Sequence, residues 1–149
     1  MDKILLSQIK EVLEERGIEY YTGGEGTIEA EFREFGILYH VCEERMDFAV
    51  RINREVPQKR MGNMLFFLNW MNNVIIDGHL EMVEENVVYR MYTDRTIKKE
   101  IGKNRIQGVL ERGNRAIELL LPAVEAICDG THDGMEAMEE IVMPQIEEE

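Results

Sequence analysis

The chain has 149 residues, 44% of them hydrophobic, which fits one domain whose core needs no disulfide bonds. Its formal net charge of −13 argues against nucleic-acid binding, which requires a basic surface, although a local basic patch between Lys98 and Arg115 remains open. No apolar run reaches the ~20 residues of a membrane span.

The N-terminal segment predicts an amphipathic helix over residues 1–16, closed by Gly17 at the position of a C-cap glycine. Its apolar residues are expected to lie on a sheet. The same segment lacks the apolar stretch of a signal peptide, and the two cysteines, Cys42 and Cys128, have no disulfide or zinc spacing. These features predict a cytoplasmic protein.

Residues 18–52 predict an antiparallel meander of three to four strands. The expected strands cover residues 18–21, 27–34, 37–43 and 46–52, with turns at Phe35-Gly36 and Glu44-Arg45. Apolar and polar residues alternate along them, which is typical of a sheet with one buried and one polar face.

The central segment predicts a helix over residues 57–76 and then two strands that meet at Glu84-Glu85-Asn86. The helix is apolar on every side. One stripe is expected to face the sheet and consists of Met61, Met64, Leu65, Leu68, Met71 and Ile75. Phe66, Phe67, Trp70 and Val74 remain on other sides and need cover from another helix or a second chain. These four are the predicted partner-binding residues, and a homodimer through this helix is the hypothesis.

Residues 94–129 predict a long helix, kinked at Pro122. Asp133 and Glu136 form the pattern of a capping box for a short helix to about Val142. Residues 144–149 are expected to be an acidic, frayed tail behind a single domain of residues 1–143. The predicted fold class is α+β, with the helices packed mainly on one face of the sheet.

Few residues indicate chemistry. The glycines of residues 23–26 favour a hairpin turn over a phosphate loop, because a strand pattern follows them. His40 and Cys42 point to one face of a strand, and a metal-dependent hydrolase is an alternative only if His79 converges on them. That ligand set is too small to predict a metal, a cofactor or a catalytic residue.

Two stretches carry a family resemblance. Leu68-Asn69-Trp70-Met71-Asn72-Asn73 runs into the strand pair of residues 77–92, and residues 119–127 form a leucine-proline stretch. This pattern resembles the YbjN-like family, described as bacterial sensory transduction regulators. The resemblance implies a fold similar to class I type III secretion chaperones, which are small, acidic, often dimeric and non-catalytic.

These observations predict a non-enzymatic protein-interaction module with a regulatory or chaperone-like role. It is expected to bind a protein or peptide through apolar surface near the central helix. The alternative is a small-ligand sensor with a pocket between the sheet and the last long helix, near Pro122.

Overall fold

The computed structural model describes residues 2–75, 77–98 and 100–147. Its elements, in chain order, are α1 (Lys3–Glu15), β1 (Tyr21–Thr22), β2 (Thr27–Glu31), β3 (Phe35–Val41), β4 (Arg45–Ile52), a 3₁₀ turn (Gln58–Arg60), α2 (Met61–Asn72), β5 (His79–Val83), β6 (Asn86–Asp94), α3 (Lys103–Asp129), α4 (Gly134–Ala137), a π-helical turn (Met138–Val142) and α5 (Met143–Glu147). Met1, Ile76, Lys99, Glu148 and Glu149 belong to predicted segments but lie outside the described residues.

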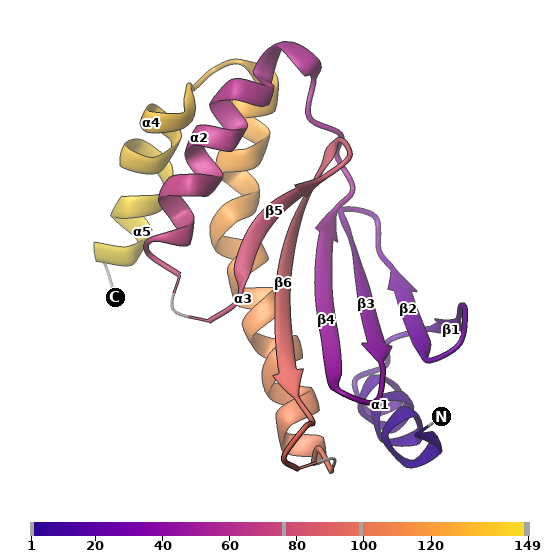
Figure 1. Cartoon of the computed structure of the whole chain (residues 1–149). Coiled ribbons are helices and arrows are strands. Elements are labelled where there is room, and N and C mark those ends of the chain that lie inside the picture. The colour runs from indigo at the N-terminus through magenta and orange to yellow at the C-terminus, as the bar shows by residue number, and fades with distance from the viewer. Residues whose placement is uncertain (1, 76, 99, 148–149) are drawn as a thin grey trace.

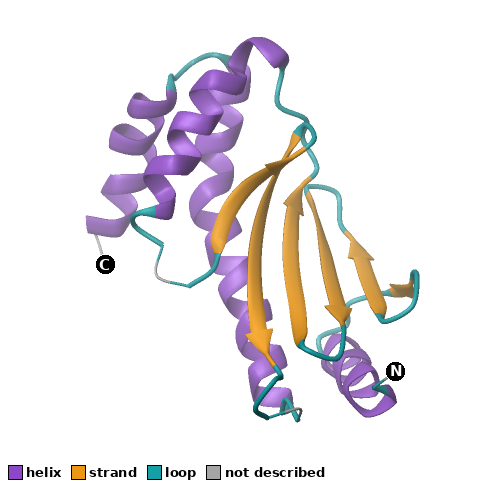
Figure 2. Ribbon diagram, viewed as in Figure 1, coloured by secondary structure: helices purple, strands orange, loops and turns teal. Residues whose placement is uncertain are grey.

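The sheet is antiparallel throughout and has the order β1-β2-β3-β4-β6-β5. The predicted meander and hairpin are therefore confirmed. The connection through α2 brings β6 beside β4, with Phe48 opposite Met91. Helices α1 and α3 lie behind the sheet and α2, α4 and α5 stand beside it (Figure 1), so the predicted α+β class is confirmed. The other face of the sheet carries no helix within the described residues (Figure 2).

Helix α3 packs closely on the centre of the sheet. Gly113 makes this possible, because a methyl group there would lie 2.7 Å from Cε2 of Phe48. The hydroxyl of the buried Tyr39 donates a hydrogen bond of 3.1 Å to the carbonyl oxygen of Ile106 on α3. Burial raises the pKa of this phenol well above its ordinary value, so the hydroxyl remains a donor at neutral pH.

A buried arginine after β6 contacts both the start of α1 and the end of β3. Arg95, which follows β6, is 2% exposed. Its guanidinium donates to the carboxylate of Asp2, the N-cap of α1, and to the carbonyl oxygen of Cys42 after β3. The Leu5 amide that donates to Asp2, together with the positive charge of Arg95, lowers the pKa of this carboxyl.

Several predicted boundaries were wrong. β1 begins only at Tyr21, and Phe35-Gly36 is the start of β3 rather than a turn. The long helix starts at Lys103 instead of residue 94, because β6 stays paired with β4 up to Asp94, opposite Arg45. The central α-helix is confined to Met61–Asn72.

The C-terminal segment corrects the prediction of a helix that ends near Val142 and a frayed tail. The chain stays helical to Glu147 and passes through Pro144. The π-helical turn lies directly before this proline, where the wider turn relieves the clash between a proline ring and the preceding turn. Among the described helices, none is long and apolar enough to cross a membrane.

Candidate functional site

Helix α2 is divided into a buried side and an exposed side that are both uncharged. Its sequence, MGNMLFFLNWMN, contains no charged residue, although 32% of the whole chain is charged. The buried side consists of Met64, Phe67, Leu68 and Met71. These side chains belong to the main hydrophobic core and fix the rotation of the helix about its axis.

The exposed side, which we call the α2 stripe, faces away from the core. It consists of Gly62, Leu65, Phe66, Asn69, Trp70, Asn73 and Val74. Its large apolar members are substantially accessible: Leu65 is 51% exposed, Phe66 43% and Trp70 42%. Exposed large apolar side chains that gather on one helix face mark a contact surface more often than scattered ones do.

The short helix α4 forms one border of the α2 stripe. A methyl group at Gly134 would lie 2.5 Å from the carbonyl oxygen of Asn63 and 3.0 Å from the ring of Phe66, so only glycine allows this approach. The predicted capping box between Asp133 and Glu136 is present and begins the segment. Met135, next to Gly134 in the chain, is 47% exposed.

Three of the four predicted partner-binding residues lie on the surface. Phe66, Trp70 and Val74 belong to the α2 stripe, and their role in binding stays a prediction. Phe67 was wrongly placed there, because it is fully buried in the core. Leu65 was expected to face the sheet and instead lies on the stripe. The helix is apolar on both sides, so hydrophobic periodicity alone does not separate them.

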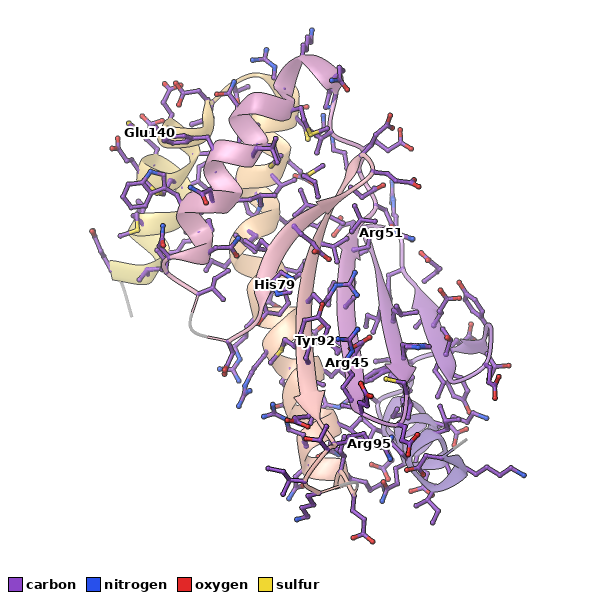
Figure 3. All side chains as sticks on the ribbon, in the orientation of Figure 1. Arg45, Arg51, His79, Tyr92, Arg95 and Glu140 are labelled. Carbon is purple, nitrogen blue, oxygen red and sulfur yellow. The ribbon has the colours of Figure 1, made fainter. Side chains whose placement is uncertain are left out.

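The open face of the sheet carries a continuous row of polar and aromatic contacts. In Figure 3, His79, Tyr92 and Arg45 follow one another across β5, β6 and β4. The guanidinium of Arg45 lies 4.7 Å from the centre of the Tyr92 ring, and the His79 ring lies 5.7 Å from it on the other side. Sequence reasoning predicted a polar face here but no such row.

Carboxylates neutralise the arginines of this face, as Glu31 does for Arg51 at 2.7 Å. Glu81 accepts a hydrogen bond of 2.7 Å from Arg90. Burial raises the pKa of this carboxyl, but Arg90 and His79 together lower it below its ordinary value. Nε of Arg45 lies 2.8 Å from Oδ1 of Asp47 as an ion pair without the alignment of a hydrogen bond. The open face is therefore internally paired rather than a free cationic surface.

The residues of the hydrolase hypothesis do not converge. His40 lies on β3 and His79 on β5, with β4 and β6 between them, a separation of about 14 Å at the ~4.8 Å strand spacing. Nδ1 of His40 lies 3.1 Å from the hydroxyl of Thr27, and the Cys42 thiol donates to the carbonyl oxygen of Arg45. Within the described part of the chain, no group of three His, Cys, Asp or Glu residues has the geometry of a metal site.

A large cleft of about 910 Å³ lies at the lower end of the sheet, beside the N-terminus of α1. Charged side chains dominate its lining, among them Lys3, Glu25 and Glu43. Its one deeply buried charge, Arg95, is bound to Asp2 and to the Cys42 carbonyl oxygen. His40 and Cys42 line the same cleft, whereas His79 does not.

A second cavity, which we call the Phe32 groove, lies between the β2–β3 turn and the middle of α3. It has a volume of about 410 Å³, within the usual range of ligand pockets. Its apolar lining consists of Ile18, Phe32, Phe35, Ile37, Ile117 and Leu121. This is the location, between the sheet and α3 and next to Pro122, at which the sequence predicts a ligand pocket.

The described fold and surfaces define a class of small α+β domain with helices on one face of an antiparallel sheet and an uncharged, exposed helix beside it. A family model matches residues 5–126, and the chain belongs to that family, YbjN, whose description is "Putative bacterial sensory transduction regulator". The expected family resemblance is therefore confirmed. The matched region ends before α4, so the helix that borders the α2 stripe lies beyond it.

Among solved structures, the chain is similar to the crystal structure of YbjN from E. coli, described as a putative transcription regulator. The two share 11% sequence identity with a TM-score of 0.61, over 81% of this chain and 90% of the other. At this identity the likeness concerns the fold. The chain has no match among curated proteins.

Proposed function

We propose that this chain is a regulatory protein-interaction module that works without catalysis, and that the α2 stripe is its binding surface. The observation that carries this proposal is an exposed helix face with no charged residue in a chain of net charge −13. Membership of a family described as regulators supports the regulatory role. A chaperone-like role is the finer form of the same proposal.

The partner that best fits the α2 stripe is a helix with an uncharged apolar face, and a second copy of this chain provides one. Two acidic chains repel each other overall, but a neutral stripe places no like charges in direct opposition at the centre of the contact. Gly62 leaves open space, with nothing within 4 Å of a methyl group built there, so a second helix can approach the backbone. We therefore propose a homodimer through α2.

The size of the α2 stripe predicts a weak complex. A helix of 12 residues is about 18 Å long and about 10 Å wide, so its face covers roughly 180 Å². A stable interface buries about 800 Å² per partner, so neighbouring surface such as Met135 has to contribute. A transient association with a dissociation constant in the micromolar range is the expected result.

Sedimentation velocity tests the dimer with two matched variants. Gly62→Arg places a long cation in the α2 stripe, and Gly108→Arg places the same side chain in α3. A methyl group built at either glycine meets no atom within 4 Å outside its own stretch of helix, so both variants are expected to fold. The wild type and Gly108→Arg should form dimers with rising concentration, whereas Gly62→Arg should remain monomeric. A wild type that stays monomeric at about 100 µM would show that the dimer is wrong.

A further inference from the structure

The Phe32 groove has the properties of a preformed binding site, independent of the α2 stripe. Its outer wall is the β2–β3 turn, and Asn53 holds that turn in place with two hydrogen bonds. The Asn53 backbone amide donates to the carbonyl oxygen of Glu34 at 2.9 Å, and its side-chain amide donates to that of Phe32, also at 2.9 Å. The other wall is the long helix α3. Because both walls are fixed by the fold, a ligand would not have to order them.

The polar groups of the groove carry one sign of charge. Glu34 on the turn and Glu118 on α3 are its charged lining residues, and the amide of Asn114 completes the polar lining. Among the described residues, no Lys, Arg or His nitrogen lies within 4.0 Å of either carboxylate. The two carboxylates thus differ from those of the open sheet face, which are paired with arginines.

The aromatic residues of the groove, like its two carboxylates, favour a positively charged ligand. The rings of Phe32 and Phe35 are stacked, with centres 4.7 Å apart and planes inclined by 24°. An aromatic face attracts a cation through its quadrupole. The apolar floor formed by Ile37 and Ile117, which are 3% and 5% exposed, accommodates an uncharged hydrocarbon body.

From this combination we propose that the Phe32 groove binds a small amphiphilic cation, namely a primary amine with a short apolar body. The hydrocarbon body lies on the isoleucines and the phenylalanines, and the ammonium group lies between Glu34 and Glu118. An anion would meet two carboxylates and no cation, and a neutral alcohol would fill the apolar floor without using the charges. The site belongs to the ligand-sensor alternative, and its occupation does not depend on a dimer through α2.

A set of three probes of equal length tests the proposal by NMR titration of the ¹⁵N-labelled chain. The probes are n-hexylammonium, n-hexanol and hexanoate. Hexylammonium should shift the amide signals of residues 32–37 and 114–121 and bind roughly tenfold more tightly than hexanol. Hexanoate should not bind. Equal affinity for hexylammonium and hexanol, shifts confined to other segments, or no binding of hexylammonium would each overturn the proposal.

Variants separate the charge of the groove from its apolar floor. In the double variant Glu34→Gln/Glu118→Gln, hexylammonium should lose its advantage of roughly tenfold over hexanol, while hexanol binding stays unchanged. Glu125→Gln, an exposed carboxylate on the same helix but outside the groove, is the matched control and should keep the full preference. A double variant that still prefers the ammonium ion would contradict the assigned role of the two carboxylates.

Discussion

The side-chain amide of Asn72 makes both hydrogen bonds that a neighbouring strand would make with Leu80. Oδ1 of Asn72 accepts from the Leu80 amide at 2.7 Å, and Nδ2 donates to the Leu80 carbonyl oxygen at 3.0 Å. β5 is an edge strand, and unpaired edges invite pairing with other chains. The last residue of α2 therefore closes the edge at this point and fixes α2 against the sheet.

Replacement of Asn72 by alanine should destabilise the chain by about 1–3 kcal/mol, because it leaves two backbone groups of Leu80 without partners. Urea denaturation measures this change, and Asn73→Ala is the neighbouring control. The Asn73 side chain makes only an exposed hydrogen bond of 3.3 Å to Asn69, so its loss should cost less than about 0.5 kcal/mol. Equal effects of the two substitutions would show that Asn72 does not protect the edge.

Two glycines on α3 predict opposite effects of the same substitution. Gly113→Ala should destabilise the chain by about 1–3 kcal/mol, because the new methyl group would overlap Phe48 and Val50. Gly108→Ala should stabilise it by about 0.5–1 kcal/mol, since its methyl group meets nothing within 4 Å and alanine favours the helix. Urea denaturation measures both changes in unfolding free energy, from the shift of the midpoint at an unchanged dependence on urea concentration. A stabilising Gly113→Ala would mean that α3 packs less closely than described.

The tip of the β5–β6 hairpin predicts a pH effect. Glu55, through a shared hydrogen bond and its charge, raises the pKa of the neighbouring Glu85 carboxyl above its ordinary value. A carboxyl whose pKa is raised by folding binds its proton more tightly in the folded state, so its contribution to stability grows as pH falls. Glu85→Gln should therefore be more stable than the wild type at pH 7.

This difference should shrink as pH falls through the raised pKa of Glu85 towards the unfolded value of about 4.3. Thermal unfolding measured at several pH values checks it. Glu19→Gln, which removes an exposed carboxylate elsewhere, is the control and should not reproduce the same pH-dependent gain. A Glu85→Gln variant that is less stable than the wild type at pH 7 would contradict the unfavourable contact with Glu55.

Two adjacent phenylalanines test which side of α2 is buried and which is exposed. Phe67→Ala should cost about 3–5 kcal/mol, because the ring is fully buried and its removal leaves a cavity. Phe66→Ala should cost about 1 kcal/mol, because much of this ring is already in contact with water. Denaturation of the two variants at low protein concentration measures the fold rather than the dimer. A larger loss of stability for Phe66→Ala than for Phe67→Ala would show that the buried and exposed sides of α2 are assigned the wrong way round.

Most of the fold follows from local patterns. Alternation of Ile28, Ala30 and their neighbours predicted the meander, and the Asp133–Glu136 capping box predicted the start of α4. The placement of β6 between β4 and β5 was not predictable, because it depends on pairing between distant segments. The extension of helix to Glu147 was also missed, since Pro144 alone indicates an end unless a wider turn accommodates it.

The candidate surface was predicted in part, and one signal was overlooked. At about 100° per residue, Gly62, Asn69 and Asn73 fall on one side of the helix, together with Phe66. These polar or small residues mark the exposed side, and Phe67 points away from it. A pocket between the sheet and α3 near Pro122 was predicted, but its lining was not, because the Phe32 groove joins Ile18, the β2–β3 turn and α3, which are far apart in sequence.

Trp70 reports directly on whether a protein partner covers the α2 stripe. It is the single tryptophan of the chain and is 42% exposed. If the second copy is that partner, Trp70 emission should move to shorter wavelength and become less accessible to acrylamide as concentration rises from about 1 to about 200 µM. The Gly62→Arg variant should show neither change. Emission and quenching of the wild type that stay constant over this range would contradict the dimer through α2.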